Sequence, residues 1–469
     1  MTRIADAIAA ARHLPRGADA GRRTFALLLA AGLCVLQAWS GLAQAKVPAE
    51  RAAELGGKLT PMGSEAAGNA DGSIPPWKPL TGTDFKRGDN PYAADKPIAT
   101  ITSKNLPQYE RFLSEGHKAL FRTFPDTYRI PLYPTRRGAA YPEWFLEATK
   151  ANATAVDLTN SGHGFCCAAK GFPFPIPGNG TEVMWNHIMR YNTRGYRGYV
   201  GSAATTTSGD YVIERSYFEL AYVYNNPEAT PETLNNQNLY VMSKTVAPAS
   251  KAGVAYLLHV PLDRITQSTA VWSFIAGGRT LRIGEVGYDN PAFEGLMTQD
   301  QLDMFNGPLD RYTIKLLGKR EMIVPYNSYR LYDPKLKYKD IVTKGHIAPE
   351  TTRFEKHRVW VIEANVREGI KHLYRKRVFY VDEDSWIVIG QDIYDDRGEF
   401  WRFAESHSIN FPNVPVMING VQVHYDLQSR RYVIINLTNE EKELIEYDWK
   451  QDPKYFTPAN LKRFATNRR

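Results

Sequence analysis

The residues best suited to acid–base chemistry are Trp185-Asn186-His187, because a histidine beside a side-chain amide can take up and release a proton near neutral pH. His187 falls on the same helical face as Met184 and Ile188, so its spacing favours a histidine packed in the core over a catalytic base. The sequence contains no GxSxG elbow, no HExxH, no CxxC and no phosphate loop of the GxxxxGK type. We therefore predict no catalytic residue, and an enzyme with an unfamiliar site stays as an alternative.

Two other groups of residues could bind a metal ion or take part in redox chemistry. Cys166 and Cys167 are adjacent, and no second ligand pair stands at zinc-site spacing. We interpret them as two small apolar residues, with a strained disulfide between neighbours or a redox role as the alternative. The acidic turns at 382–384 and 395–396 lack the spaced oxygen ligands of a calcium loop, so we expect solvated hairpin turns. The sequence predicts no metal and no cofactor.

The element that must position His187 is a proline-rich strap followed by a short helix. Pro173, Pro175 and Pro177 hold the backbone extended and remove three amide donors, which excludes a helix interior or a central strand. The turn at 178–180 follows, and a helix is predicted from Thr181, with Thr181 as its N-cap. Two earlier helices are predicted at 106–121 and 140–150.

From residue 210 onward the apolar pattern changes to the period of two that is typical of strands. The predicted strands are 211–224, 239–246, 254–262, 270–275, 280–286, 358–366, 372–381, 386–394 and 399–409, with Gly277-Gly278 as a hairpin turn. Because the links between the last four strands are short, these strands should pair antiparallel. Several strands carry apolar residues on both faces, so part of the sheet should be covered on both sides.

The first 45 residues have the pattern of an export signal. Five arginines precede an apolar run at 25–36, and Ala43-Gln44-Ala45 supplies the small residues that a signal peptidase needs. A membrane-spanning anchor would need roughly 20 apolar residues, and Gln37 and Ser40 interrupt this run too early. We expect cleavage before Lys46 and a soluble periplasmic protein, exported by the general secretory route or, through Arg22-Arg23, by the twin-arginine route.

The net charge of the chain indicates which classes of partner it can bind. The net charge is +8, and +5 remains without residues 1–45. This mildly basic balance favours the anionic surfaces of a cell envelope, including peripheral contact with a membrane, and does not favour nucleic acid, which needs basic residues clustered on one face. The densest basic run, 375–377, lies in a strand pattern, so we interpret it as a solvated strand edge.

Several long segments resemble a single family. They are GFPFPIPGNGTEVMWNHIMR at 171–190, the lead-in text LGGKLTPMGSEAAGNADGSIPPW, residues 271–327 with their YDNP turn, and RVFYVDEDSWIVIGQDIYDDRGEFWR at 377–402. Together they resemble the large periplasmic family catalogued as domain of unknown function 1329, whose fold is related to the lipoprotein carriers LolA and LolB. Cys166-Cys167 and the charged carboxyl terminus depart from the family pattern.

The resemblance implies an α+β fold, a LolA/LolB-like half-barrel in which a curved antiparallel β-sheet has helices covering its concave face. Together with the residue patterns described above, it leads us to divide the chain into a signal peptide (1–45), an extended lead-in packed on the body (46–100), a LolA-like domain (101–440) and a charged carboxyl-terminal tail (441–469).

The resemblance also implies a periplasmic carrier or chaperone for a hydrophobic molecule, a lipid or a lipoprotein acyl chain, working with an envelope exporter of the resistance-nodulation-division type. The residues expected to line the ligand cavity are Trp360, Ile362, Phe379, Trp401 and Phe403. Two alternatives stay open: an enzyme acting on an envelope lipid or a hydrophobic small molecule, and a structural envelope protein without a ligand.

Overall fold

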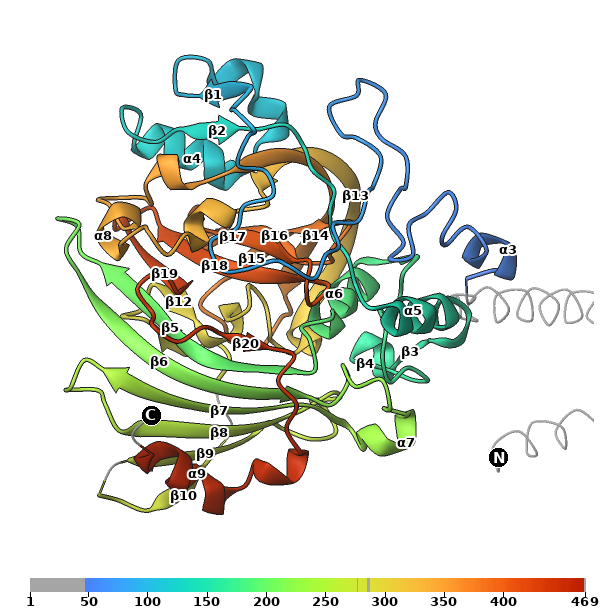
Figure 1. Ribbon diagram of the computed structural model, residues 1–469, viewed down its shortest axis with the longest axis vertical. Helices are drawn as coiled ribbons and strands as arrows, with labels where there is room; N and C mark the ends of the chain where they lie inside the picture. The colour runs from blue at the N-terminus through green and yellow to red at the C-terminus, as the bar shows by residue number, and fades with distance from the viewer. Residues whose placement is uncertain (1–46, 276, 285–286, 468–469) are drawn as a thin grey trace, which may run out of the picture. The chain divides into compact units, whose positions relative to one another are not determined.

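The computed structural model describes residues 47–467, except residues 276, 285 and 286. The predicted export signal and its cleavage site before Lys46 therefore lie outside the described residues. The described chain is a mixed α+β structure built on one large curved sheet, in which all strand pairs but one are antiparallel (Figure 1). Within these residues, no helix has both the length and the apolar character that crossing a bilayer requires.

The main sheet has 16 strands, and its strand order does not return on itself, so the sheet is open. In pairing order the strands are β1 (Ala99–Ile101), β2 (Ile130–Leu132), β14 (Phe354–Val366), β15 (Lys376–Asp382), β16 (Val388–Tyr394), β17 (Phe400–Phe411), β18 (Val416–Asp426), β19 (Arg431–Leu437), β5 (Gly195–Thr205), β6 (Tyr211–Tyr222), β7 (Gln237–Ala247), β8 (Val254–Pro261), β9 (Ala270–Ile275) and β10 (Thr280–Ile283). In addition, β13 (Tyr312–Pro325) pairs with β14, and β20 (Glu446–Tyr447) pairs with β5.

The predicted antiparallel meander is confirmed. Ile362 of β14 lies opposite Phe379 of β15, which lies opposite Gln391 of β16, as the short links require. The sheet does not begin at residue 210, however, because β5 precedes it and pairs with β19. Glycines at 195, 198 and 201 interrupt the apolar alternation of β5. Consequently the sequence pattern does not predict β5, the strand that joins β14–β19 to β6–β10.

The helices differ from their predicted bounds for local reasons. The helix predicted at 106–121 is two short 3-10 turns (Leu106–Gln108 and Glu110–Phe112) followed by α4 (Glu115–Thr123), whose N-cap Ser114 accepts a hydrogen bond from the His117 amide. The helix predicted at 140–150 is α5 (Glu143–Ala155) and follows Pro142. Helix α6 (Gly180–Met189) is capped by Asn179 and not by Thr181, since the Asn179 side chain accepts a hydrogen bond from the Glu182 amide.

The remaining elements are short. They are α3 (Ala49–Ala52), α7 (Pro231–Leu234), α8 (Tyr338–Ile341), α9 (Pro458–Thr466), the 3-10 turns at Asn160–Gly162, Gln299–Gln301, Leu309–Arg311, Tyr329–Tyr332, Pro349–Thr351 and Pro453–Tyr455, and two small hairpins, β3 (Leu158–Thr159) with β4 (Gly164–Phe165) and β11 (Pro291–Ala292) with β12 (Met297–Thr298).

The sheet curls around α6 and the segment 287–311, which cover its concave face (Figure 1). On that face the Phe305 ring contacts Phe379 with 5.2 Å between ring centroids, and the Gln391 amide donates to the carbonyl of Met304 at 2.8 Å. Helices α4 and α9 pack on the opposite, convex face, α4 against β16 and β17 and α9 against β7 to β10. A helix thus covers the concave face as predicted, and further helices cover parts of the convex face.

The strap at 171–180 is tied to α6. Asn186 accepts a hydrogen bond from the Phe174 amide at 2.9 Å and donates to the Phe174 carbonyl at 2.7 Å, so one side chain satisfies both backbone groups of an extended residue. Gly63 of the lead-in lies so close to this strap that a Cβ atom there would sit 1.8 Å from the Pro175 carbonyl oxygen. Only glycine fits at that contact.

The acidic turn at 382–384 is buried and not solvated, which corrects our expectation. Arg137 donates to both carboxylate oxygens of Asp384 at 2.8 Å, and Arg358 donates to Glu383 at 2.6 Å. Both arginines also donate to backbone carbonyls of the lead-in at Glu65 and Ala67. These ion pairs offset the cost of burying the carboxylates and fasten residues 64–67 to the turn.

The carboxyl-terminal residues 441–467 also lie against the sheet. Strand β20 pairs with β5, and α9 buries Leu461 and Phe464 against β7 to β10. From the lead-in, the Arg87 guanidinium reaches across to donate to the carbonyls of Thr438, Asn439 and Glu441.

Candidate ligand cavity

The largest cavity described lies where the lead-in meets the carboxyl-terminal segment. It has a volume of about 410 Å³, within the range of about 300–1,000 Å³ typical of small-molecule sites. Its apolar lining comes from four distant parts of the chain: Phe85, Tyr329, Tyr332, Ile409, Phe411, Val414, Leu444, Ile445 and Tyr447. Its charged groups are Lys86, Arg87, Asp89, Glu443 and Glu446.

Aromatic rings in contact with one another form one wall of this cavity. The Phe411 and Tyr447 rings lie 4.7 Å apart between centroids, and Phe85 packs edge-on against Phe411 at 5.9 Å. Phe85 also contacts Tyr329, whose hydroxyl donates to the Asn410 carbonyl at 2.8 Å. Burial raises the pKa of the Tyr329 and Tyr332 hydroxyls, so both rings remain neutral. The wall therefore presents apolar ring surface without charge.

The cavity is held together by the Arg87 contacts. Arg87 donates to the backbone carbonyls of Thr438 at 2.7 Å and of Glu441 at 2.9 Å. These bonds join the 85–89 side of the cavity to the segment that continues into Leu444, whose side chain is 57% exposed. The cavity thus has a fixed base and one exposed apolar residue at its rim.

The five residues predicted to line a cavity are placed on both faces of the sheet. Trp360, Ile362 and Phe379 belong to the cluster around α6 on the concave face, and the last two are at most 1% exposed. Phe403 lies on the convex face beneath α4, where a Cβ atom at Gly116 would sit 1.9 Å from its ring. Trp401 is half-buried, and its indole donates to Asp426 at 3.1 Å. None of the five lines the 410 Å³ cavity.

His187 occupies the core, as its spacing predicted. Its Nδ1 accepts a hydrogen bond from the Val388 amide at 3.1 Å, and its Nε2 faces the Asp303 carbonyl at 3.1 Å. Burial lowers the pKa of His187 to about 3, with the nearby Arg190 acting in the same direction. A neutral histidine with both nitrogens partnered is a structural residue.

Among the described residues, one group has the composition of a metal site: His357, Asp382 and Asp384 offer ligand atoms within 4.8 Å of one another. Both oxygens of Asp384 are already taken, by Arg137 and by the Ser64 hydroxyl at 2.6 Å. The guanidinium supplies the positive charge that a metal ion would bring, so the group is a buried ion-pair cluster.

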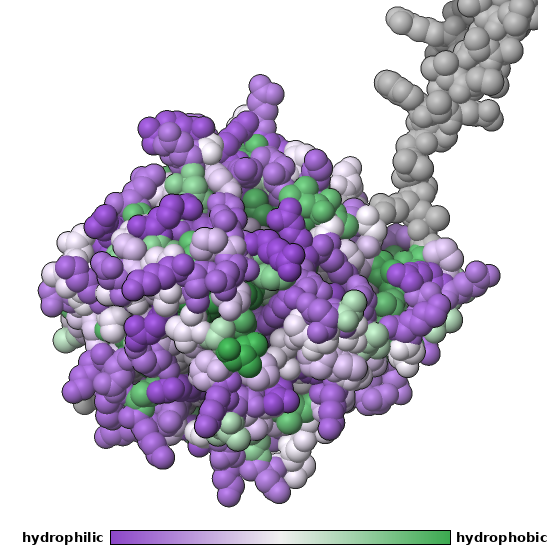
Figure 2. All heavy atoms as spheres, turned by 90° about the horizontal axis from the view of Figure 1, so that it is seen from above, coloured by the Kyte–Doolittle hydropathy of each residue, from purple (hydrophilic) through white to green (hydrophobic). Residues whose placement is uncertain are grey.

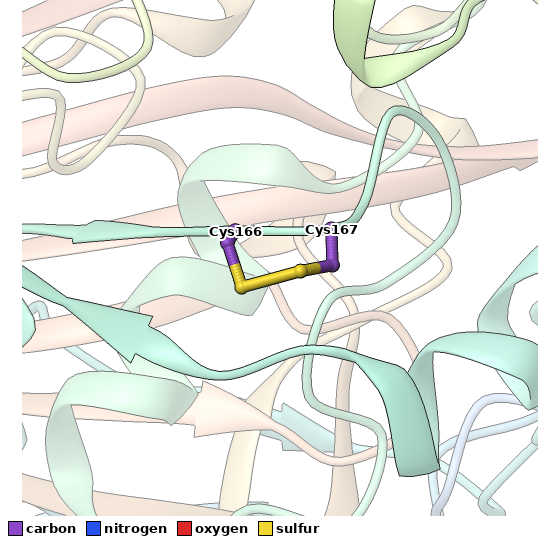
Figure 3. Close-up of a disulfide and its surroundings, with 2 residues drawn as sticks. All are labelled: Cys166 and Cys167. Carbon is purple, nitrogen blue, oxygen red and sulfur yellow. A yellow bond between two sulfur atoms is a disulfide. The ribbon is translucent and has the colours of Figure 1, made fainter.

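Cys166 and Cys167 are joined by a disulfide between neighbouring residues (Figure 3). This replaces our interpretation of two separate apolar side chains. Cys167 is exposed and has a φ of 73°, a conformation that few non-glycine residues adopt. Because the bond joins adjacent residues, it does not link one element of the fold to another.

A second cavity, of about 320 Å³, lies under α4 and contains a carboxyl group with a shifted pKa. Burial raises the pKa of Asp392 to about 6. The same carboxylate accepts hydrogen bonds from the Gly116 amide at 2.9 Å and the Tyr380 hydroxyl at 2.6 Å. These partners anchor the amino terminus of α4, so this group holds the helix in place.

Sequence reasoning missed the residues of the 410 Å³ cavity because none of them forms a local motif. Phe85 lies in an irregular lead-in, and Phe411 and Tyr447 are 36 positions apart in the chain. The one available signal was the resemblance of the lead-in to the family pattern, which indicated that this segment packs onto the body.

Comparison with known proteins places this fold and cavity in a family. The model of the family described as Protein of unknown function (DUF1329) matches residues 100–462. The chain is also 41% identical over 452 residues to the uncharacterized protein PA3922 of Pseudomonas aeruginosa, covering 94% of this chain and 99% of that protein. The chain therefore belongs to the DUF1329 family.

Two solved structures show weaker likeness. A DUF1329 family protein from Desulfovibrio piger is 12% identical, with a TM-score of 0.39, covering 57% of this chain and 92% of that chain. The LolA superfamily protein NE2245 from Nitrosomonas europaea is 12% identical, with a TM-score of 0.36, covering 60% of this chain and 98% of that chain. We draw no conclusion about function from likeness at this level.

Proposed function

We propose that the protein is a periplasmic carrier or chaperone that shelters a hydrophobic molecule, a lipid or a lipoprotein acyl chain, in the 410 Å³ aromatic cavity. The observation that carries this proposal is the cavity itself, whose lining includes nine neutral aromatic and aliphatic side chains beside its charged groups. Each methylene moved from water into such a space gains about 0.8 kcal/mol. A carrier needs an apolar hollow that shelters its cargo from water and needs no covalent chemistry.

The charged rim suggests how the cargo is oriented. Lys86 is exposed beside Phe85, while Arg87 is occupied with backbone carbonyls. A ligand with an acyl chain and an anionic head group would place the chain against the rings and the head group beside Lys86. Handover from an envelope exporter of the resistance-nodulation-division type is part of this proposal and rests on the family resemblance.

The test is binding of a fluorescent fatty acid to protein purified without detergent. Phe85→Asn and Leu444→Asn each place an amide against the cavity, and each should weaken probe binding by roughly tenfold or more, because an apolar contact of about 1.5–3 kcal/mol is lost. Leu317→Asn is the matched control: Leu317 is 43% exposed and lies outside the cavity.

The control variant should bind the probe like the wild type. Leu444→Asn and Leu317→Asn change exposed side chains and should keep the wild-type melting temperature within about 2 °C, whereas Phe85→Asn also loses ring contacts and should lower it by a few degrees. Mass spectrometry of organic extracts from the untreated protein would identify the natural cargo. If the wild type binds no probe and extracts contain no lipid, the proposal fails and a structural role remains. Turnover of the probe would instead favour the alternative of an enzyme.

A further inference from the structure

Large apolar side chains are exposed at the β8–β10 end of the sheet. Tyr256 is 39% exposed, Ile275 58%, Leu281 44% and Ile283 38%, and Ile265 in the connecting loop is 49% exposed. They make up five of the twelve most exposed large apolar residues in the described part of the chain, although they span fewer than 30 positions. Exposed apolar residues scattered singly need no explanation, but a cluster indicates a binding surface.

Strand register places four of these side chains on one face. Leu281 lies opposite Ser273, and Ser273 lies opposite Tyr256. In the next rows Ile283 lies opposite Val271, and Ile275 lies opposite Val254. Alternate side chains, such as Leu257 and Phe274, point to the other face and are buried under α9. We call the exposed group, Tyr256, Ile275, Leu281 and Ile283, the edge patch.

Basic residues lie at the same end of the sheet as the edge patch, in the hairpin turn and on the opposite face. The hairpin segment 265–284 contains Arg279 and Arg282 and no acidic residue, and the segment 453–467 that carries α9 contains Lys454, Lys462 and Arg463 and no acidic residue. All five basic side chains are exposed. Arg282 lies over the half-buried Trp272 ring at 5.7 Å, on the face of the sheet opposite to Leu281. Arg279 in the hairpin turn and Arg282 on the other face of the edge strand β10 therefore place positive charge at the sheet edge next to the apolar patch.

By contrast, the face of the molecule shown in Figure 2 is predominantly hydrophilic, and its apolar groups are small and separate.

We propose that the edge patch docks the protein on an anionic lipid bilayer. Where the free edge of β10 meets the bilayer, Ile275, Leu281 and Ile283 would enter the boundary between head groups and acyl chains, while Arg279 in the hairpin turn and Arg282 in the same edge strand bind lipid phosphates. Tyr256, which belongs to the patch, is a residue of the kind enriched at membrane interfaces. A second copy of the chain is a poorer occupant, because pairing of two β10 edges would bring Arg279 and Arg282 of one copy toward those of the other. This docking does not depend on the aromatic cavity holding a ligand.

The experiment is co-sedimentation of the protein, with no ligand added, with vesicles of phosphatidylcholine alone or of equal parts phosphatidylcholine and phosphatidylglycerol. The wild type should bind the anionic vesicles and be released by high salt, which screens exposed charges. The double variant Arg279→Gln/Arg282→Gln should bind roughly 25-fold more weakly, since each basic residue contributes about fivefold. Leu281→Ser/Ile283→Ser should lose at least about tenfold, because two partly exposed aliphatic side chains no longer enter the lipid.

Ile98→Ser is the matched control, since Ile98 is 66% exposed and lies outside the β8–β10 edge. It should bind vesicles like the wild type, and the melting temperature of every variant should match that of the wild type. Failure of the wild type to bind anionic vesicles would overturn the proposal. A dimer that Leu281→Ser/Ile283→Ser converts to a monomer, without any change in vesicle binding, would assign the patch to self-association instead.

These measurements separate the two proposals. Phe85→Asn should weaken capture of the fatty-acid probe and leave vesicle binding unchanged, whereas Arg279→Gln/Arg282→Gln should do the reverse. If the edge-patch variants weaken probe capture and spare vesicle binding, the patch is part of the cargo site and membrane docking is wrong.

Discussion

Strands β14–β16 and strands β8–β10 belong to one sheet and show the same alternation of side chains, but their burial differs. In the first region both faces are covered: Ile362 and its neighbour Val361 are at most 2% exposed. In the second region Leu257 is fully buried under α9, while its neighbour Tyr256 is 39% exposed. The strands themselves do not account for this difference. It follows from the segments that pack on them. In the first region these are α6 and residues 287–311 on the concave face and α4 on the convex face, whereas in the second region only α9, of the segments that the structure describes, covers one face.

The largest expected effect comes from placing the same polar side chain in each region. Ile362→Asn and Phe403→Asn put an amide into closely packed core and should lower the free energy of unfolding by about 4 kcal/mol or more. Leu281→Asn on the exposed edge should change it by less than about 0.5 kcal/mol. Urea denaturation of the three variants measures this contrast.

The same variants test the cavity-lining role predicted for Trp360, Ile362, Phe379, Trp401 and Phe403. If Ile362→Asn or Phe403→Asn kept the wild-type stability and lost only probe binding, that residue would line a ligand space that opens from the packed state. Two-sided packing of β14–β16 would then be an incomplete description of this half of the sheet.

Much of the sheet follows from local pattern. Alternation located β9 at 270–275 to the residue, and apolar residues on both faces of β14 and β16, such as Val361 and Ile389, correctly indicated burial on both sides. The burial of a strand can be predicted from its own sequence, because successive side chains point to opposite faces and each must suit the surface that it contacts.

Features that depend on a distant partner could not be predicted in this way. Arg377 was expected at a solvated edge, but it is fully buried, and its guanidinium donates to Asp300 at 2.7 Å. The acidic turn at 382–384 is buried because Arg137 pairs with Asp384. The two residues are 247 positions apart in the chain, so no local pattern indicates the pair. A charged residue is predicted to be solvated when its partner in the fold is unknown. The aromatic cavity could not be predicted for the same reason, because its lining comes from four separated segments.

An effect of intermediate size is expected in the pH dependence of the unfolding free energy, through Asp392 of strand β16. Burial raises the pKa of Asp392 to about 6, from an unfolded value of about 3.9. A carboxyl with a raised pKa stabilises the fold below its unfolded pKa, and that stabilisation is lost as the pH rises through the folded pKa. The wild type should therefore lose up to about 2–3 kcal/mol relative to Asp392→Asn between about pH 4 and pH 6. Unfolding free energies of both proteins across this range are the measurement, and a constant difference would show that Asp392 does not titrate there. Leu281→Asn at the exposed β8–β10 edge should not alter the pH dependence of the unfolding free energy, because it removes no titratable group.

The smallest effect is expected at the seam between the two regions. Ile188 lies at the end of α6 and is half-buried, beside Leu262 and Ile265 of the loop between β8 and β9. The space between these residues is only about 10 Å³, no more than a single water molecule needs. A fully buried Ile→Ala change costs about 2–5 kcal/mol, but partial exposure should reduce the cost of Ile188→Ala to about 1–2 kcal/mol.

Val183→Ala in the same helix is the matched control. Because Val183 is fully buried, this variant should lose more unfolding free energy per carbon atom removed. Equal losses per carbon would mean that α6 packs as tightly against the β8–β9 loop as against β13 and β14. The boundary between the covered and the exposed regions would then lie beyond Ile265, closer to the edge patch.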